Sequence, residues 1–306
     1  MLRTALVLLA SLLLTQLHAL DTAGLPADTR WTVQLDAKAL LSGNLGAWIK
    51  DQATRGPAKA RLALLRTITG CNPLTDIDRV VLAGPDAGEE KAVLLAYGRF
   101  DSERLATVAE AAPEHQTFAH GTRTIHRWRD DQSGQIRFGL LDGTVLIIGR
   151  ELDRVAAVLD VRDGAAVGVK PGTLPEPPTA TGTVVISGAA EAIDAWQNLK
   201  PEAAIFKQAR SIALVLSESG DALTIQANLA AADAETATQI EQVINGFIAL
   251  GRMQADKLGD KPLAKTALAG VTVNREGTVV TVGTTLPAAE VTKALDAKRA
   301  AHRGDG

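Results

Sequence analysis

The octapeptide DGTVLIIG at residues 142–149 has a close counterpart in EGTVVTVG at residues 276–283, with four of eight positions identical. In both copies an acidic residue and a glycine precede a run of β-branched and apolar residues, a pattern typical of a tight turn that enters a strand. Gly143 and Gly277 are expected in the turn because glycine accepts the positive φ that a two-residue reversal needs. The repeat predicts a module that occurs twice and ends each time on the same hairpin.

The segments before the two octapeptides follow one order. Each begins with a strand and then a helix that contains a tryptophan, Trp48 or Trp196. A pair of apolar strands follows, and then an aspartate at the start of a second helix. Asp101 and Asp233 suit the N-cap position, and the glutamate two residues later is favoured by the helix dipole. The shared order predicts that the copies superimpose, with Trp48 close to Trp196.

The fold class expected is α+β: two similar modules, each an antiparallel sheet with helices packed on one face. The strand pairs have short turns, whereas parallel strands need long crossover connections. The modules are expected over residues 29–165 and 183–302. Between them a Pro-rich linker is expected over residues 166–182, because four of the twelve prolines of the chain fall there and proline favours extended backbone.

The two copies differ in two places. The first has an additional helical stretch at 56–68 and an additional hairpin at 115–128. The second has a long helix that starts at Asp233. Apolar residues recur along this helix at helical spacing and form one stripe: Ile240, Val243, Ile244, Phe247 and Ile248. We expect that stripe to lie across a sheet.

Residues 1–19 have the pattern of a secretory signal peptide. Arg3 precedes the apolar run Ala5–Leu14, and Ala19 is a small residue at which a signal peptidase could cut. This run of ten residues, nine of them apolar, is too short to span a bilayer, which needs roughly 20 apolar residues in a helix. We expect a mature chain that begins near Leu20, has no transmembrane segment and is exported to a bacterial periplasm or secreted. Retention of the leader as an anchor is the alternative.

Charge and composition exclude some functions. The chain has 32 basic and 35 acidic residues, and loss of Arg3 with the leader leaves 31 against 35, a net charge of −4. No basic block is present, so a nucleic-acid partner is not expected. Four Trp, one Tyr and five Phe leave few stacking platforms for sugars or bases. Cys71 is the only cysteine, which excludes an internal disulfide and favours a small buried thiol.

The additional hairpin of the first copy is the most unusual stretch of the chain. Its candidate binding residues are Arg123, His126, Arg127, Trp128 and Asp130. Arg123 and Arg127 alternate with Trp128, so one face of the strand would carry two guanidinium groups and the other an indole. One interpretation is an arginine-lined surface for a carboxylate or an anionic polymer. The other, which we favour, is a half-buried strand with Trp128 in the core and the arginines in solvent.

The same hairpin holds the candidate residues for a catalytic site. His126 with Asp130 or Asp131 could serve a hydrolase near residues 120–133. Those turn residues are equally typical of a β-turn, and the chain has no G-x-S-x-G, S-x-x-K or H-E-x-x-H motif. His120 and His126 would lie roughly 20 Å apart on an extended strand. We therefore expect no metal site and no cofactor.

Three consecutive segments of the first copy resemble a known set of proteins: GRFDSERL (98–105), HGTRTIHRW (120–128) and FGLLDGTVLIIG (138–149). With this spacing, residues 29–165 are similar to uncharacterised exported bacterial proteins that carry a domain of unknown function. The resemblance implies a signal peptide, a duplicated α+β module and no known cofactor.

These observations favour a non-catalytic, exported binding or scaffold protein whose partner is an envelope protein or a small ligand. The alternative is a periplasmic hydrolase with a site near the 120–133 hairpin.

Overall fold

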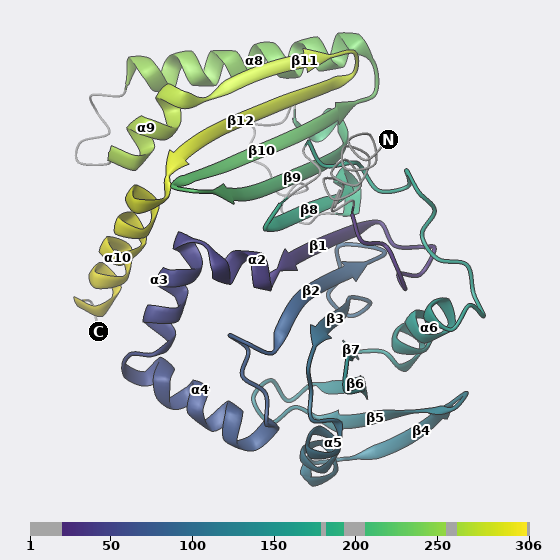
Figure 1. The fold of residues 1–306 in the computed structure, drawn as a ribbon. Coiled ribbons are helices and arrows are strands. Elements are labelled where there is room, and N and C mark those ends of the chain that lie inside the picture. Colours follow the sequence, from purple (N-terminus) through teal and green to yellow (C-terminus); the bar gives the residue numbers. More distant parts are fainter. Residues whose placement is uncertain (1–19, 179–181, 193–205, 255–261, 305–306) are drawn as a thin grey trace, which may run out of the picture.

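Twelve strands form one antiparallel sheet in the computed structural model of the chain, which describes residues 20–178, 182–192, 206–254 and 262–304. Eight α-helices accompany the sheet in this part of the chain (Figure 1), so the predicted α+β class is confirmed. The expected leader and Trp196 lie outside the described residues.

The elements follow the chain in this order. The first seven strands are β1 (Trp31–Asp36), β2 (Ile77–Gly84), β3 (Val93–Gly98), β4 (Gln116–His120), β5 (Arg123–Arg129), β6 (Ile136–Leu141) and β7 (Val145–Gly149). The other five are β8 (Val184–Ala189), β9 (Ala209–Ser219), β10 (Ala222–Ala231), β11 (Thr272–Glu276) and β12 (Val279–Pro287). The helices of the first part are α2 (Ala37–Ser42), α3 (Asn44–Ala53), α4 (Gly56–Thr69), α5 (Ser102–Ala111) and α6 (Leu152–Arg162). A short 3₁₀ turn, η1 (Ala190–Ala192), precedes α8 (Ala234–Met253), α9 (Pro262–Gly270) and α10 (Ala288–Gly304).

The expectation of two separate sheets is wrong, because β1 and β8 pair with each other. Their antiparallel register runs from Trp31 opposite Gly188 to Leu35 opposite Val184. Each strand would otherwise leave a row of unpaired backbone groups at the edge of its own sheet, and the pairing satisfies both rows at once. The result is a single sheet in the order β11-β12-β10-β9-β8-β1-β2-β3-β7-β6-β5-β4.

From this central junction the strand order follows one pattern in both directions. The first half runs β1-β2-β3-β7-β6 and the second runs β8-β9-β10-β12-β11. In each half the second strand of the final hairpin lies next to the third strand of that half: β7 next to β3, and β12 next to β10. The first half then continues into β5 and β4, which are the hairpin predicted at 115–128.

The predicted helix starts at Asp101 and Asp233 are confirmed. The Asp101 carboxylate accepts a hydrogen bond from the Arg104 amide at 3.0 Å and begins α5. The Asp233 carboxylate accepts one from the Thr236 amide at 2.8 Å and begins α8. In both helices the cap satisfies an amide that has no partner inside the helix.

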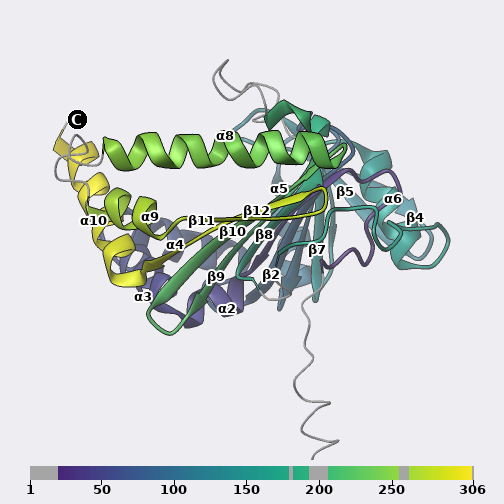
Figure 2. The ribbon, with the colours of Figure 1, turned by 90° about the horizontal axis from the view of Figure 1, so that it is seen from above.

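Two clusters of buried side chains lie on opposite faces of the sheet. The first includes Val81 and the apolar side of α6, and the second includes Leu229 and the apolar side of α8. Residues paired on neighbouring strands share a face of the sheet. When the partner of Val81 is followed from strand to strand, the series reaches Gln226, so Gln226 lies on the same face as Val81. Leu229 is three residues farther along the same strand and therefore faces the other way. Helices thus cover both faces of the single sheet, α6 on one face and α8 on the other, and Figure 2 shows α8 lying lengthwise against its face.

The octapeptides form the β6–β7 and β11–β12 turns, as predicted, but the buried residue differs. Gly277 has a φ of +57°, whereas Gly143 is not among the positive-φ glycines. Val145 is fully buried against the first cluster. At the corresponding place Val279 is only partly buried, and its neighbour Val280 is the fully buried residue. The cause is that α6 and α8 cover opposite faces.

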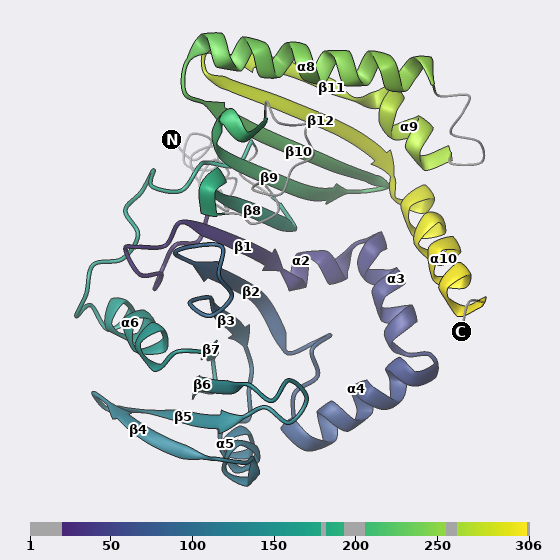
Figure 3. The same ribbon diagram turned by 180° about the vertical axis from the view of Figure 1, so that it is seen from behind.

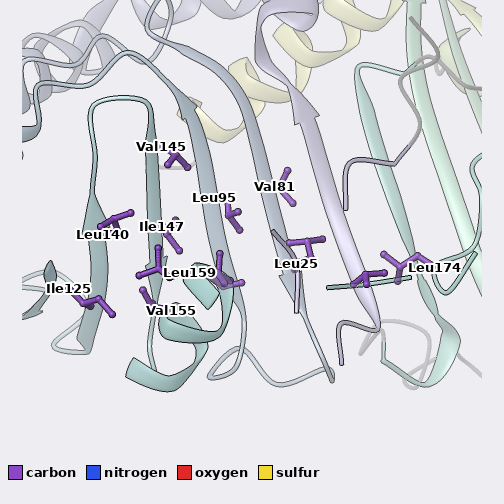
Figure 4. Packing of buried hydrophobic residues seen from close by; sticks show 14 residues of the cluster. Leu25, Val81, Leu95, Ile125, Leu140, Val145, Ile147, Val155, Leu159 and Leu174 are labelled. Atoms are coloured by element: carbon purple, nitrogen blue, oxygen red, sulfur yellow. The ribbon is translucent and has the colours of Figure 1, made fainter. Parts of the chain in front are cut away.

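The Pro-rich segment packs on the sheet. Val169 and Leu174 belong to the first buried cluster, together with Leu25 from the beginning of the described chain, and Figure 4 shows Leu25 and Leu174 among its apolar side chains. The amide of Val169 donates a hydrogen bond to the Leu25 carbonyl at 3.0 Å. This pair of segments covers the centre of the face on which α6 lies.

The second half also touches the helices of the first half. Figures 1 and 3 show α10 running away from the sheet alongside α3. The indole Nε1 of Trp48 on α3 donates to Asp296 Oδ1 of α10 at 2.8 Å. At the other end of α3, the Glu218 carboxylate of β9 accepts hydrogen bonds from the Asn44 and Leu45 amides. These contacts hold the two halves together away from the β1–β8 junction.

Candidate functional site

The predicted binding residues lie on β5 and in the turn that follows it. β5 is the second strand from one end of the sheet, between β4 and β6. Helix α5 contacts β5 and β6, and the C-terminal end of α6 approaches the turn between β4 and β5. The structure therefore brings Arg123, His126, Arg127, Trp128 and Asp130 to one end of the molecule, but it distributes them over two faces of the strand.

The expectation that Trp128 lies in the core and the arginines in solvent is wrong. Ile125, which shares a face with Arg123 and Arg127, is the fully buried residue of β5 and packs in the first cluster. Trp128 is half-buried on the other face, where its ring lies against Gly139 of β6. The strand alternates as predicted, but α6 covers the arginine face and buries the isoleucine between them.

The guanidinium groups of this strand are engaged within the chain. Arg123 Nη2 lies 2.7 Å from Asp163 Oδ1, just after α6. Arg127 Nη2 lies 3.1 Å from Glu114 Oε2, and Arg129 Nε lies 2.6 Å from the other oxygen of the same carboxylate. These hydrogen bonds from Arg129 and Arg127 lower the pKa of Glu114 below its usual value. The cationic face is thus largely neutralised.

Glu114 itself has an unusual backbone. It is the one residue other than glycine with a positive φ among the described residues, at 56°. A non-glycine side chain is disfavoured in that region. The two arginines that bind the carboxylate hold Glu114 in place, so this corner of the hairpin is a fixed structural element.

His126 contacts a second histidine. His115 Nε2 and His126 Nδ1 are 3.1 Å apart, and the ring centroids are separated by 5.4 Å. Burial lowers the pKa of His126, and the nearby His115 lowers it further, while Glu110 of α5 acts in the opposite direction. The pair favours at least one neutral imidazole because two charged rings at this distance would repel each other.

Asp130 is part of a turn. Its Oδ1 accepts hydrogen bonds from the amides of Gln132 at 2.8 Å and Ser133 at 3.2 Å. These backbone hydrogen bonds lower the pKa of Asp130. His126 has His115 as its ring partner. Among the described residues, this turn therefore does not bring His126, a carboxylate and a hydroxyl together as a hydrolase would need.

The histidines do not form a metal centre with one another. His120 Nε2 lies 2.8 Å from Asp160 Oδ1 of α6, while His126 faces His115. Within the described residues no group of three or more His, Cys, Asp or Glu side chains is arranged to hold a metal ion. Cys71 is buried, and burial, followed by the charge of Asp76, raises the pKa of its thiol.

Sequence reasoning missed an exposed apolar surface on α4. This helix of 14 residues has no buried residue. Leu64, Leu65 and Ile68 are 60%, 42% and 45% exposed. Arg104 of α5 donates hydrogen bonds to the last carbonyls of α4, those of Thr67 and Ile68, so α4 is attached by its end and not by an apolar face. The available signal was the absence of acidic residues from GPAKARLALLRTIT, which leaves a basic helix with an apolar stripe.

A second exposed apolar surface lies at the end of α8. The first part of the predicted stripe is buried, since Ile240 and Ile244 pack on the sheet. Beyond Gly246 the helix exposes Phe247, Leu250 and Met253. No helix in the described ranges is both long and apolar enough to cross a membrane. Isolated exposed apolar residues are ordinary, but groups of them on one helix mark interaction surfaces.

The arrangement defines a class of α+β protein. A continuous antiparallel sheet has helices on both faces, and two peripheral helices, α4 and α8, carry exposed apolar side chains. No protein family and no curated protein sequence matches the chain. The fold is similar to that of TP0453, a Treponema pallidum protein of poorly defined function. Its crystal form III aligns with a TM-score of 0.50 and 10% identity over 91% of this chain and 98% of that chain. Crystal forms IV and I give TM-scores of 0.47 and 0.48. At this identity the likeness shows the fold alone.

Proposed function

We propose that this chain is a non-catalytic, exported binding or scaffold protein and that α4 is its binding surface. The observation that supports this proposal is an entire helix without a buried residue, on which three large apolar side chains are exposed. Exposure of these side chains is unfavourable by itself, and burial of the exposed half of each against a partner would recover roughly 1 kcal/mol per side chain. The envelope of the cell is where we expect the partner.

An internal duplication would support a scaffold role. We propose that residues 29–165 and 183–302 are two copies of one module, joined by the segment 166–182. The common strand order on both sides of the β1–β8 junction supports this, as do the aspartate caps of α5 and α8. Among the described residues the second half has no counterpart of the β4–β5 hairpin, and the sequence predicts α4 as an addition to the first copy, so the function that distinguishes the copies would reside in these two elements.

The proposal of export rests on the leader and on the residues just after it. Asp21, the second residue of the expected mature chain, is fixed by two hydrogen bonds. Its amide donates to Gln34 Oε1 at 3.0 Å, and its carbonyl accepts from Gln34 Nε2 at 2.9 Å. The chain is thus held to β1 directly after the expected cleavage site. We expect protein purified from the native host to begin near Leu20, and a chain that retains Met1 would contradict cleavage.

A double substitution on α4 tests the binding surface. Leu64→Glu with Leu65→Glu should leave the melting temperature within about 2 °C of wild type, because neither side chain is buried. The same variant should lose the molecule that co-purifies with the wild type from a native envelope fraction, identified by mass spectrometry.

The matched control is Lys59→Glu with Arg61→Glu, which changes the charge of α4 and keeps its apolar residues. If the leucine variant captures the same molecule in the same amount as wild type, α4 is not the binding surface.

A further inference from the structure

A pocket of about 240 Å³ opens where α2 and α3 meet the segment that leads into β2. It lies beside the sheet and away from the β4–β5 hairpin and from the apolar residues of α4. Its lining comes from four parts of the chain: α2, α3, residues 74–78 and the residue after β3. A concave site with contributions from several elements is the usual form of a small-molecule site.

Three cationic side chains line this pocket. Lys38 is on α2, Lys50 is on α3, and Arg99 directly follows β3. Neither lysine forms an ion pair with a residue in the described part of the chain. Arg99 donates to the Thr75 carbonyl at 2.5 Å, and its guanidinium is 3.6 Å from Asp76 Oδ1, so it is held in position at the edge of the pocket.

One carboxylate and three apolar residues also line the pocket. Asp78 is the acidic residue among the lining side chains, so positive charge exceeds negative charge in the pocket. Leu41, Leu74 and Ile77 supply an apolar wall. Their side chains are partly buried. The pocket therefore combines an excess of cations with an apolar surface, which suits a ligand that has an acidic group at one end and a short hydrocarbon body.

We propose that this pocket binds a small organic anion, with its acidic group between Lys38, Lys50 and Arg99 and its apolar body against Leu41, Leu74 and Ile77. The volume lies below the roughly 300–1,000 Å³ typical of drug-sized ligands, so the ligand has a short chain. The acidic group is a carboxylate or a phosphate monoester, since both accept hydrogen bonds from ammonium and guanidinium groups. The inference goes beyond the α4 surface and assigns a separate site to a small ligand.

Titration calorimetry on the purified full chain tests this site with three probes of equal chain length: hexanoate, hexyl phosphate and hexylamine. We expect one or both anions to bind and hexylamine not to bind. Which anion binds more tightly identifies the acidic group. Binding should weaken as sodium chloride is raised from 0.05 to 0.5 M, because salt screens the charges at the rim.

Three variants complete the test. Lys38→Gln with Lys50→Gln should weaken anion binding at least tenfold, and Asp78→Asn should strengthen it, because it removes a repelling carboxylate. Lys59→Gln on α4, outside the pocket, should change nothing. Equal affinities for all variants, binding of hexylamine, or absence of heat with both anions at 10 mM would each overturn the proposal. These measurements need no envelope fraction, so failure here is distinguishable from failure of the α4 surface.

Discussion

At the scale of single residues, the hairpin of the first half is an arrangement of ion pairs and hydrogen bonds. Glu114 accepts from Arg127 and Arg129, and Asp130 closes its own turn. The residue types and their alternation could be read from RTIHRW. Their partners could not, because Asp163 and Glu114 are placed by the fold and not by spacing along the strand.

Burial of His126, and secondarily its neighbour His115, makes stability depend on pH. The pKa of His126 is lowered in the folded protein. In the unfolded chain it takes up a proton near pH 6.5. Below that pH the unfolded state binds more protons at this position, so the free energy of unfolding falls as the pH falls, and above it the effect is absent. The melting temperature of the wild type should therefore fall further between pH 7.5 and 5.0 than that of His126→Gln.

Thr124→Val, at an exposed position on the same strand, should show the wild-type pH dependence. Scanning calorimetry at both pH values gives all three melting temperatures. If the melting temperature falls equally in the wild type and in His126→Gln, His126 does not resist protonation in the folded protein.

At the scale of elements, the sequence predicted the helix starts and the turns, but it did not predict which element covers each apolar face. Asp101 and Asp233 marked two helix starts because capping is a local hydrogen bond. The octapeptides marked two hairpins for the same reason. Nothing local distinguishes Val145 from Val279, and their different burial follows from α6 and α8 packing on opposite faces. Likewise, the apolar residues of α4 have helical spacing, and only the structure shows that no element of the described chain covers them.

The stripe of α8 gives a stability test of one element. Ile244 is 8% exposed and packs on the sheet, whereas Gln242 is exposed. Ile244→Asp should reduce the free energy of unfolding by roughly 3–5 kcal/mol, because it buries an unpaired carboxylate and removes apolar contacts. Gln242→Asp should change it by less than about 0.5 kcal/mol.

Urea unfolding followed by circular dichroism provides both values. Similar midpoints for the two variants would contradict the packing of this part of α8 on the sheet.

At the scale of the whole molecule, the sequence indicated two units and the structure has one sheet. The strands that open the two halves, β1 and β8, are ordinary apolar strands. Their sequences give no sign that they pair with each other. Glu218 and Trp48 add contacts between the halves that depend on tertiary structure alone. The class, the strands and the hairpins were therefore accessible from the sequence, and the junction was not.

Separating the halves tests this junction. Residues 20–178 and 182–304 made as separate chains should each self-associate, because each exposes the backbone of β1 or β8 at a new edge. Refolded together, they should form a 1:1 complex with the circular dichroism spectrum of the intact protein. Light scattering coupled to size exclusion gives the masses. Two stable, folded monomers would instead support independent domains.

The junction also has a consequence for the rate of folding. Val33 pairs with Ile186, which is 153 positions away (186 − 33). Contacts over such a separation form slowly, because chain entropy must be lost before the pairing stabilises the product. The β2–β3 and β9–β10 hairpins join neighbouring segments and should form first. Until β8 arrives, a newly made chain carries β1 as an open template for aggregation, and a chaperone that delays aggregation should act on this strand during that interval.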